Sequence, residues 1–432
     1  MSEFINRPLS RRGFLGGATV AAGLGLTACG GQQQQKTEAP SGKEGGGTIT
    51  AGTAYSTQNY DPSTTSSALA LGVNWQVVEG LYGLNFHDYS TFNELATADP
   101  KKVDDYTFEI TLRDGAKFSD GNEVKADDVV ESFNRSAAKG SVYVPMLAPI
   151  ASVEKKDDKT VTVKTTIANF SLLKERLSIV RVVPASSSQD EMKKQPVGSG
   201  PWQFESISDN TLDLVPNKNY NGATPAKDDK LHYDVLKDPT ARLTAQQDGT
   251  TLAMEMVPAD AVDQLKGAGC TVDAVQGFGV RFAMFNLGKA PWDNVKVRQA
   301  CLYALDTDKM LANAFSGQAE IATSYLPSSF ANYHKASTVY AHDAEKAKKL
   351  ISESGITPGD VVLRTTDNEQ VKSMATQVKN DLDALGFNVS IVSDTSPATY
   401  AAIDAADGSW DILLAPGDPS CFGADVDLLL NW

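Results

Sequence analysis

The sequence contains few of the residues that build metal centres and redox sites. It has four cysteines and four histidines in 432 residues. The cysteines form no Cys-x-x-Cys pair, and the histidines form no His-Glu-x-x-His or other paired spacing; they are His87, His232, His334 and His342. Zinc and thiol-redox sites need such spacings. We therefore expect no metal and no cofactor.

Basic patches and catalytic motifs are also missing. The formal net charge is −15, whereas nucleic-acid binding requires clustered Lys and Arg, so we expect no nucleic-acid partner. Gly198-Ser199-Gly200 lacks the Gly-x-Ser-x-Gly spacing of hydrolases, and no Walker lysine follows it. No constellation of nucleophile and base can be found in the sequence, so an extracytoplasmic hydrolase has no motif in its favour, and it stays open only as an alternative function class.

Long hydrophobic runs are absent after residue 30, so no segment there is a transmembrane candidate. The apolar run at 13–28 is short, follows Arg11-Arg12, and ends in Leu26-Thr27-Ala28-Cys29. Its start resembles a twin-arginine export motif, and its end resembles a bacterial lipobox, in which the cysteine receives lipid. We predict a signal peptide at 1–28 and lipidation of Cys29. The twin-arginine and general export routes both stay open.

The segment that follows is rich in Gly, Gln, Lys and Glu and has almost no apolar residues. Such a composition cannot bury enough surface to fold, so 29–47 is expected to be a flexible linker. We therefore place the protein outside the cytoplasm, anchored to the cell membrane by its N-terminal lipid. The remaining chain is too long for one core and suggests two or three lobes.

Three cysteines remain after Cys29. Cys301 lies on an apolar stripe at helical spacing and is expected to be a buried small hydrophobe. Cys270 and Cys421 are candidates for a long-range disulfide, which an oxidising compartment permits. Pairing and two free thiols both stay open.

Hydrophobic periodicity and turn residues predict two differently organised regions. In the N-terminal region we expect strands at 48–52, 107–112, 153–165 (a hairpin), 202–215 and 251–256, and helices at 67–81, 125–138, 238–247 and 258–266. In the C-terminal region we expect strands at 280–287, 361–365, 387–392 and 410–415, and helices at 294–305, 306–315, 343–354, 370–385 and 397–406. The alternation in the C-terminal region predicts a mostly parallel sheet, with ligands beyond the carboxyl ends of its strands.

Four segments resemble a known family. They are Tyr106-Thr107-Phe108-Glu109-Ile110-Thr111-Leu112-Arg113-Asp114-Gly115 with its continuation to Gly121 and Ala126-Asp127-Asp128-Val129; Pro196-Val197-Gly198-Ser199-Gly200-Pro201-Trp202; Phe285-Asn286-Leu287 with 291–300 and Ala304-Leu305-Asp306; and the helix at 344–355. In this order they resemble the family-5 extracellular solute-binding proteins, the peptide and nickel binders of ABC importers. The resemblance covers most of residues 48–432.

The resemblance implies an α/β fold of the two-lobed periplasmic-binding-protein type, with a hinge and an extra domain inserted in the first lobe. The implied first lobe consists of two separate segments, 48–92 and 191–272, with the inserted domain at 93–190 between them. The implied second lobe is 273–432. Family chains usually continue well beyond a segment such as 427–432. We therefore expect the C-terminal portion of the second lobe to be missing, and whether the chain is a fragment stays open.

The resemblance also points to ligand-binding residues. Asp418 could pair with a ligand ammonium, as in peptide-binding relatives that hold the free amino end with an aspartate; the alternative is a turn residue before Pro419. Gly417 would let the backbone approach the ligand. Tyr55 could stack on the ligand. Phe278 and Arg281 flank the crossing into the second lobe, where Arg281 could meet a ligand carboxylate or form a surface ion pair.

These inferences predict a lipid-anchored solute-binding protein that captures short peptides by hinge closure and delivers them to a membrane permease. We expect a monomer that performs no chemistry on its ligand. Other small polar solutes, such as a sugar, an opine or a metal chelate, remain alternatives, although the four histidines give nickel no direct support. Within the family's Arg-Gln-Ala segment, Arg298 is expected to form a structural ion pair.

Overall fold

The computed structural model describes residues 46–330, 332–405 and 408–417. Among these residues the strands form one five-stranded sheet, two four-stranded sheets and a two-stranded hairpin. Each of the three larger sheets contributes strands to its own hydrophobic core. No helix within these ranges is long and apolar enough to cross a membrane.

The five-stranded sheet combines segments from both sides of a long insertion. Its strands, in spatial order, are β11 (Ala253–Met254), β1 (Thr48–Thr53), β10 (Lys230–Val235), β9 (Thr211–Pro216) and β8 (Trp202–Ile207). β1 runs parallel to both of its neighbours, so the carboxyl ends of β11, β1 and β10 lie at one edge of the sheet.

Two helices pack against β1 from opposite faces. Side chains alternate faces along a strand. Ile49 packs against the core that contains α1 (Ala68–Val77), whereas a Cβ on Gly52 would lie 3.9 Å from Arg242 Cγ in α6 (Pro239–Asp248). α6 begins where the sequence predicts, because Asp238 accepts a hydrogen bond from Ala241 N at 2.8 Å and caps the first turn.

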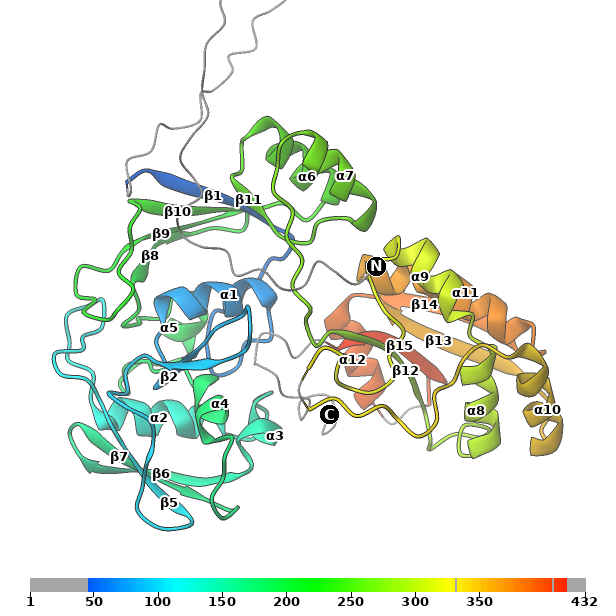
Figure 1. Ribbon diagram of the computed structural model, residues 1–432, viewed down its shortest axis with the longest axis horizontal. Coiled ribbons are helices and arrows are strands. Elements are labelled where there is room, and N and C mark those ends of the chain that lie inside the picture. The colour runs from blue at the N-terminus through cyan, green and yellow to red at the C-terminus, as the bar shows by residue number, and fades with distance from the viewer. Residues whose placement is uncertain (1–45, 331, 406–407, 418–432) are drawn as a thin grey trace, which may run out of the picture. The chain divides into compact units, whose positions relative to one another are not determined.

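The insertion forms an antiparallel sheet of its own. Its strands, in spatial order, are β4 (Lys101–Lys102), β5 (Thr107–Thr111), β7 (Thr160–Thr165) and β6 (Ile150–Asp157). The helices are α2 (Ala126–Ser136), α3 (Val144–Leu147), α4 (Leu173–Ser178) and α5 (Gln189–Lys194), and the hairpin consists of β2 (Tyr82–Leu84) and β3 (Thr91–Asn93). α2 packs on β6 and β7, which form the hairpin predicted at 153–165 (Figure 1).

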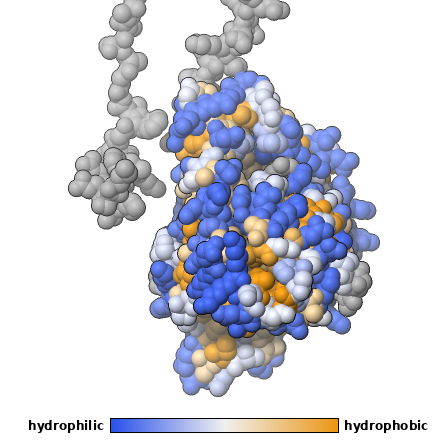
Figure 2. Space-filling model, turned by 90° about the vertical axis from the view of Figure 1, so that its right-hand side faces the viewer, coloured by the Kyte–Doolittle hydropathy of each residue, from blue (hydrophilic) through white to orange (hydrophobic). Residues whose placement is uncertain are grey.

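The third sheet confirms the prediction of a mostly parallel sheet. Its spatial order is β12 (Val280–Phe285), β15 (Ile412–Gly417), β13 (Asp360–Thr366) and β14 (Asn388–Asp394), and only β12 is antiparallel to its neighbour. The helices are α8 (Val295–Ala304), α9 (Thr307–Phe315), α10 (Ala344–Ser354), α11 (Glu369–Asp383) and α12 (Ser396–Asp404). Figure 2 views this side of the molecule and shows a surface that is mainly hydrophilic with scattered hydrophobic patches.

Several predicted boundaries differ from the observed ones. The helix expected at 67–81 ends at Val77, and the strand expected at 251–256 is only β11. The helix expected from Pro258 starts as a 3-10 turn, η1 (Ala259–Ala261), and continues as α7 (Val262–Gly267). β10 was not predicted. The ion pair expected for Arg298 is not found among the described residues, where its Nη1 donates to the carbonyl oxygen of Trp292 at 2.6 Å.

Candidate functional site

The carboxyl edge of the five-stranded sheet brings together residues that lie far apart in the sequence. β1 leads directly into Ala54 and Tyr55, and β11 leads directly into Glu255. Thr53 Oγ1 donates to Glu255 Oε1 at 2.5 Å, and Ala54 N donates to the same oxygen at 3.1 Å. Ligands of open α/β sheets bind beyond such ends, so this edge is a candidate binding site.

A pocket of about 280 Å³ lies between α1 and this edge. It is lined by Ala51, Gly52, Thr53, Ala68, Leu69, Gly72, Val73, Gln76, Tyr233, Ala253, Met254 and Glu255. Ala68 and Gly72 are small, which leaves the space along α1. At the far end of α1, Gln76 Nε2 donates to Tyr233 Oη at 2.7 Å. The pocket lining is therefore largely apolar, and its polar side chains are Thr53, Gln76, Tyr233 and Glu255. Ligand sites usually combine an apolar lining with a few polar groups in this way.

Arg242 lies on the opposite side of the sheet and supports the edge. Its guanidinium donates to the carbonyl oxygens of Leu236 (2.6 Å), Lys237 (2.9 Å) and Met256 (3.3 Å). Burial lowers the pKa of Arg242, and the nearby Glu255 carboxylate opposes that shift. Met256 has φ +54, a value that non-glycine residues rarely adopt. The turn after β11 is thus held in an unusual conformation by a buried arginine.

The Glu255 carboxylate also influences the α1 side of the sheet. Burial raises the pKa of the Tyr233 phenol, the Gln76 hydrogen bond opposes the shift, and Glu255 adds to it. The Tyr233 hydroxyl therefore stays neutral near pH 7 and can donate or accept a hydrogen bond. Glu255 is the charged residue of the pocket lining.

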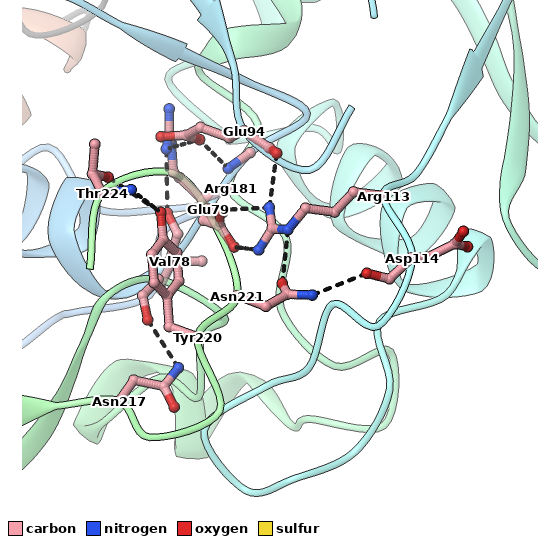
Figure 3. Close-up of polar contacts among 12 residues, drawn as sticks. Val78, Glu79, Glu94, Arg113, Asp114, Arg181, Asn217, Tyr220, Asn221 and Thr224 are labelled. Atoms are coloured by element: carbon pink, nitrogen blue, oxygen red, sulfur yellow. Dashed lines mark hydrogen bonds and ion pairs between the residues drawn. The ribbon is translucent and has the colours of Figure 1, made fainter. Parts of the chain in front are cut away.

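A buried ion network of Glu79, Glu94, Arg113 and Arg181 (Figure 3) lies next to the end of α1, the helix that forms one wall of the pocket. Arg113 binds Glu79 with both terminal nitrogens, at 2.7 and 2.8 Å. Arg181 Nη1 donates to Glu94 Oε2 at 2.9 Å, and its guanidinium lies 3.4 Å from the ring centroid of Trp75 in α1. Burial raises the pKa of Glu94, whereas Arg181 lowers it. These contacts tie α1 to the side of the molecule that carries the inserted sheet.

Two glycines allow a close approach to the end of α1. A Cβ on Gly198 would lie 2.0 Å from the Val77 carbonyl oxygen, and one on Gly200 would lie 2.5 Å from the Gln76 carbonyl oxygen. Gly200 N donates to Val77 O at 2.9 Å. The segment Gly198-Ser199-Gly200 therefore packs closely against the end of α1, the helix that forms the pocket wall.

The second predicted group of site residues meets at the end of the third sheet. Gly417 is the last residue of β15 and lies opposite Val280, and Arg281 lies opposite Pro416. Arg281 Nη2 donates to Gln370 Oε1 in α11. The structure therefore places Gly417 and Arg281 on neighbouring strands, whereas Tyr55 belongs to the edge of the five-stranded sheet. Asp418 lies outside the described residues.

Phe278 lies in an aromatic cluster just before β12. Only 1% of it is exposed. Its ring centroid is 4.8 Å from that of Tyr89, in the turn between β2 and β3, and 4.1 Å from that of Phe330. Phe278 thus packs against residues from two distant segments of the sequence, and its contact with a ligand stays a prediction.

The cysteines differ in their surroundings. Cys301 is buried, as predicted, and burial raises the pKa of its thiol to about 12. Cys270 is half-buried, and Cys421, like Cys29, lies outside the described residues, so their pairing stays a prediction. Within the described ranges, no three His, Cys, Asp or Glu residues are grouped so that they could hold a metal ion.

The sequence patterns did not single out Glu255, Gln76 or Tyr233. The signal available for Tyr233 was the alternation of Leu231, Tyr233 and Val235 with polar residues ahead of the helix cap Asp238. Glu255 follows a two-residue strand, which is too short to show a period.

Comparison with known proteins agrees with this architecture. The chain is 32% identical over 363 residues to "Heme-binding protein A" of Haemophilus influenzae, which covers 74% of this chain and 64% of that protein. It is 26% identical over 328 residues to the dipeptide-binding protein of Escherichia coli, which covers 67% of this chain and 61% of that protein. The chain spans about half to two thirds of the length of such curated relatives.

Solved structures share the fold. DppA from Helicobacter pylori in complex with the peptide STSA superposes with a TM-score of 0.77 at 20% identity, over 89% of this chain and 81% of that one. AgaA from A. tumefaciens in complex with agropinic acid gives a TM-score of 0.77 at 24% identity, over 89% and 80% of the two chains.

Residues 92–429 match the family described as bacterial extracellular solute-binding proteins, family 5 middle. This match extends over more than half of the chain and confirms the resemblance carried by the four sequence segments. The chain belongs to the family 5 bacterial extracellular solute-binding proteins, and it has their two-lobed periplasmic-binding-protein-like α/β fold.

Proposed function

We propose that this protein is the solute-binding component of an ABC importer, which captures short peptides by hinge closure and delivers them to a membrane permease. The observation that carries the proposal is membership of family 5, together with a pocket at the carboxyl ends of the parallel strands β11, β1 and β10. Relatives named for dipeptides and for the peptide STSA support a peptide ligand.

We further propose the division into 48–92, 93–190, 191–272 and 273–432 that the family resemblance implies. The sheet topology supports it, because β1 pairs with β10 across a long insertion whose strands form a separate sheet. Closure of one lobe on the other would bury the ligand and would strengthen each polar contact to it.

The proposed ligand contacts are Asp418, Gly417, Tyr55, Phe278 and Arg281. Support comes from the strand ends, since Tyr55 follows β1 and Gly417 ends β15. Asp418 is the next residue of the sequence after β15. An aspartate there would form a charge-assisted hydrogen bond with a ligand ammonium.

A second candidate ligand is another small polar solute. Relatives named for heme and for agropinic acid favour this alternative, because they share the family or the fold with peptide binders. The ligand therefore has to be identified directly.

The test is to identify what the protein carries. Protein purified under native conditions is denatured, and the released small molecules are analysed by mass spectrometry. We expect peptides of a few residues, and we expect trialanine to raise the melting temperature of stripped, refolded protein, by mass action. Recovery of a saccharide, an opine or a chelate, with no thermal shift from any peptide, would overturn the peptide assignment.

The lipid anchor at Cys29 needs its own experiment. Wild-type protein made in a bacterial host is expected to partition into the detergent phase of a cloud-point separation, and Cys29→Ala is expected to move to the aqueous phase. Cys270→Ala is the matched control and should partition like the wild type. Equal partitioning of Cys29→Ala and the wild type would exclude lipidation at this residue.

A further inference from the structure

Glu255 has a carboxylate oxygen that accepts no hydrogen bond from the part of the chain that the structure describes. Its Oε1 accepts hydrogen bonds from Thr53 Oγ1 at 2.5 Å and from Ala54 N at 3.1 Å. Among the described residues, none donates to Oε2, and no lysine or arginine forms an ion pair with this carboxylate. The two donors fix the carboxylate at the pocket and leave its second oxygen available.

Arg242 forms no ion pair with this carboxylate. The Glu255 carboxylate acts to raise the pKa of Arg242, but this arginine is buried on the α6 side of the sheet. Its terminal nitrogens donate to three carbonyl oxygens. A charged group held by neutral donors and lacking an ion-pair partner attracts a cation from outside.

The rest of the pocket complements the same kind of ligand. No lysine, arginine or histidine is among its described lining residues, so it offers no charge to a ligand carboxylate. Gln76 and Tyr233 bond to each other and keep one amide oxygen and one hydroxyl proton for a ligand. The remaining wall is made of small and apolar residues of α1, β1 and β11. Such a site fits a positively charged group next to a short apolar segment.

We infer that Glu255 anchors a positively charged group of the bound peptide. The inference rests on the proposed peptide-binding function. A volume of about 280 Å³ is just below the roughly 300–1,000 Å³ of pockets that hold a whole small ligand, so it accommodates one end or one side chain of a peptide. The positive group is either the α-ammonium or a basic side chain, and both present N–H donors to Oε2.

The test compares three peptides by isothermal titration calorimetry. The probes are trialanine, N-acetyl-trialanine and N-acetyl-alanyl-lysyl-alanine, measured with wild-type protein and Glu255→Gln. Glutamine keeps an oxygen for Thr53 and Ala54 and removes the charge. Loss of a charge-assisted contact should weaken the recognised peptide about ten- to a hundredfold.

The three peptides distinguish the two possible sources of the positive charge, the α-ammonium and a basic side chain. Weaker binding of trialanine alone identifies the α-ammonium, and weaker binding of the acetylated lysine peptide identifies the side chain. Glu345→Gln on α10 is the matched control, because Glu345 is 88% exposed in its pair with Lys348 and lies outside the pocket. Peptide binding that Glu255→Gln leaves unchanged in every arm would overturn the inference while the proposed function stands. If wild-type protein binds none of the peptides, the peptide assignment falls, and the inference falls with it.

A second variant tests the pocket itself. Nothing lies within 4 Å of a Cβ built on Gly72, so the first atom of a larger side chain has room there, and Gly72→Leu adds apolar volume to the pocket lining and improves helix propensity. We expect Gly72→Leu to fold like the wild type and to lose at least about tenfold in affinity, the equivalent of one lost contact. Gly267→Leu in α7 is equally open and lies outside the pocket, so it should bind normally. Full affinity in a folded Gly72→Leu would contradict the assignment of this pocket.

Discussion

Asp411 and Glu255 each lie beside one of the two sheets that contain parallel strands. Their positions at opposite ends of the strands give the two carboxylates different surroundings. Asp411 precedes β15, at its amino end, and its side chain is 4% exposed. Its Oδ1 accepts from Trp292 Nε1 at 2.9 Å and from Lys289 Nζ at 2.8 Å, and its Oδ2 accepts from Val362 N at 2.8 Å. Glu255 follows β11, at its carboxyl end, is exposed, and has one oxygen engaged. The saturated, buried carboxylate holds a sheet together, whereas the half-engaged one is available to a ligand.

Asp411→Ala should produce the largest effect on stability. It would leave the Trp292 indole N–H and the Val362 amide buried without an acceptor, and we expect a loss of about 3–5 kcal/mol in the free energy of unfolding. Urea denaturation measures this change. Glu255→Ala should cost less, about 1–2 kcal/mol, because it removes the acceptor of Thr53 Oγ1 and Ala54 N but lies at an exposed position. Equal effects of the two variants would remove the distinction between the carboxylates.

Arg113→Ala tests the support of the pocket wall. Glu79 is 5% exposed, and Arg113 provides both of its charge-assisted hydrogen bonds. Removal of one partner of such a pair leaves a buried charge, so we expect a loss of about 3 kcal/mol. The control Lys348→Ala breaks an exposed pair and should cost at most about 0.5 kcal/mol. A small effect of Arg113→Ala in urea denaturation would mean that water replaces the lost contacts.

Local signals predicted the elements of the third sheet well. Asp306 and Asp343 cap α9 and α10 by accepting hydrogen bonds from Lys309 N and Lys346 N, and Gly355 ends α10 in the left-handed conformation. Caps of this kind depend on residues within one turn of each other. The sequence alone is therefore sufficient to locate them.

The pocket could not be predicted in the same way. The hydrogen bond between Thr53 and Glu255 joins residues 202 positions apart, and it exists only because β1 pairs with β11. β10, the strand between β1 and β9, was missed although Leu231, Tyr233 and Val235 alternate with polar residues over its six positions. The strand that places Tyr233 was therefore absent from the predicted sheet. Long-range pairing, which one sequence does not encode locally, makes this site.

Asp418→Ala tests by binding the proposed contact with a ligand ammonium. If Asp418 pairs with the ligand ammonium, its removal should weaken peptide binding by about 2 kcal/mol, the worth of a hydrogen bond to a charged group. Asp360→Ala, at the first residue of β13 and hence at the amino end of the third sheet, is the matched control and should bind normally. Calorimetry with trialanine measures both. Unchanged affinity of Asp418→Ala would exclude this residue from the site.

A smaller effect distinguishes the sheets by pH. His232 in β10 lies between two carboxylates, with Nδ1 at 2.7 Å from Asp213 and Nε2 at 3.3 Å from Asp234. The Asp213 hydrogen bond, the largest favourable cause, raises the pKa of His232 above its ordinary value of 6.5. The folded state then binds more protons than the unfolded state between the two pKa values, so stability falls as pH rises through that window.

The stabilisation from protonated His232 is fully present below pH 6.5 and is lost as the pH passes the folded-state pKa. Hydrogen exchange resolved by segment should show faster opening of β9 and β10 as the pH rises, after correction for intrinsic exchange rates. β13 and β14 in the third sheet should not follow this trend. His232→Gln keeps a donor for Asp213 and should remove the pH dependence from β9 and β10. If the two sheets lose protection in parallel, the titrating group lies elsewhere, and His232 does not distinguish them.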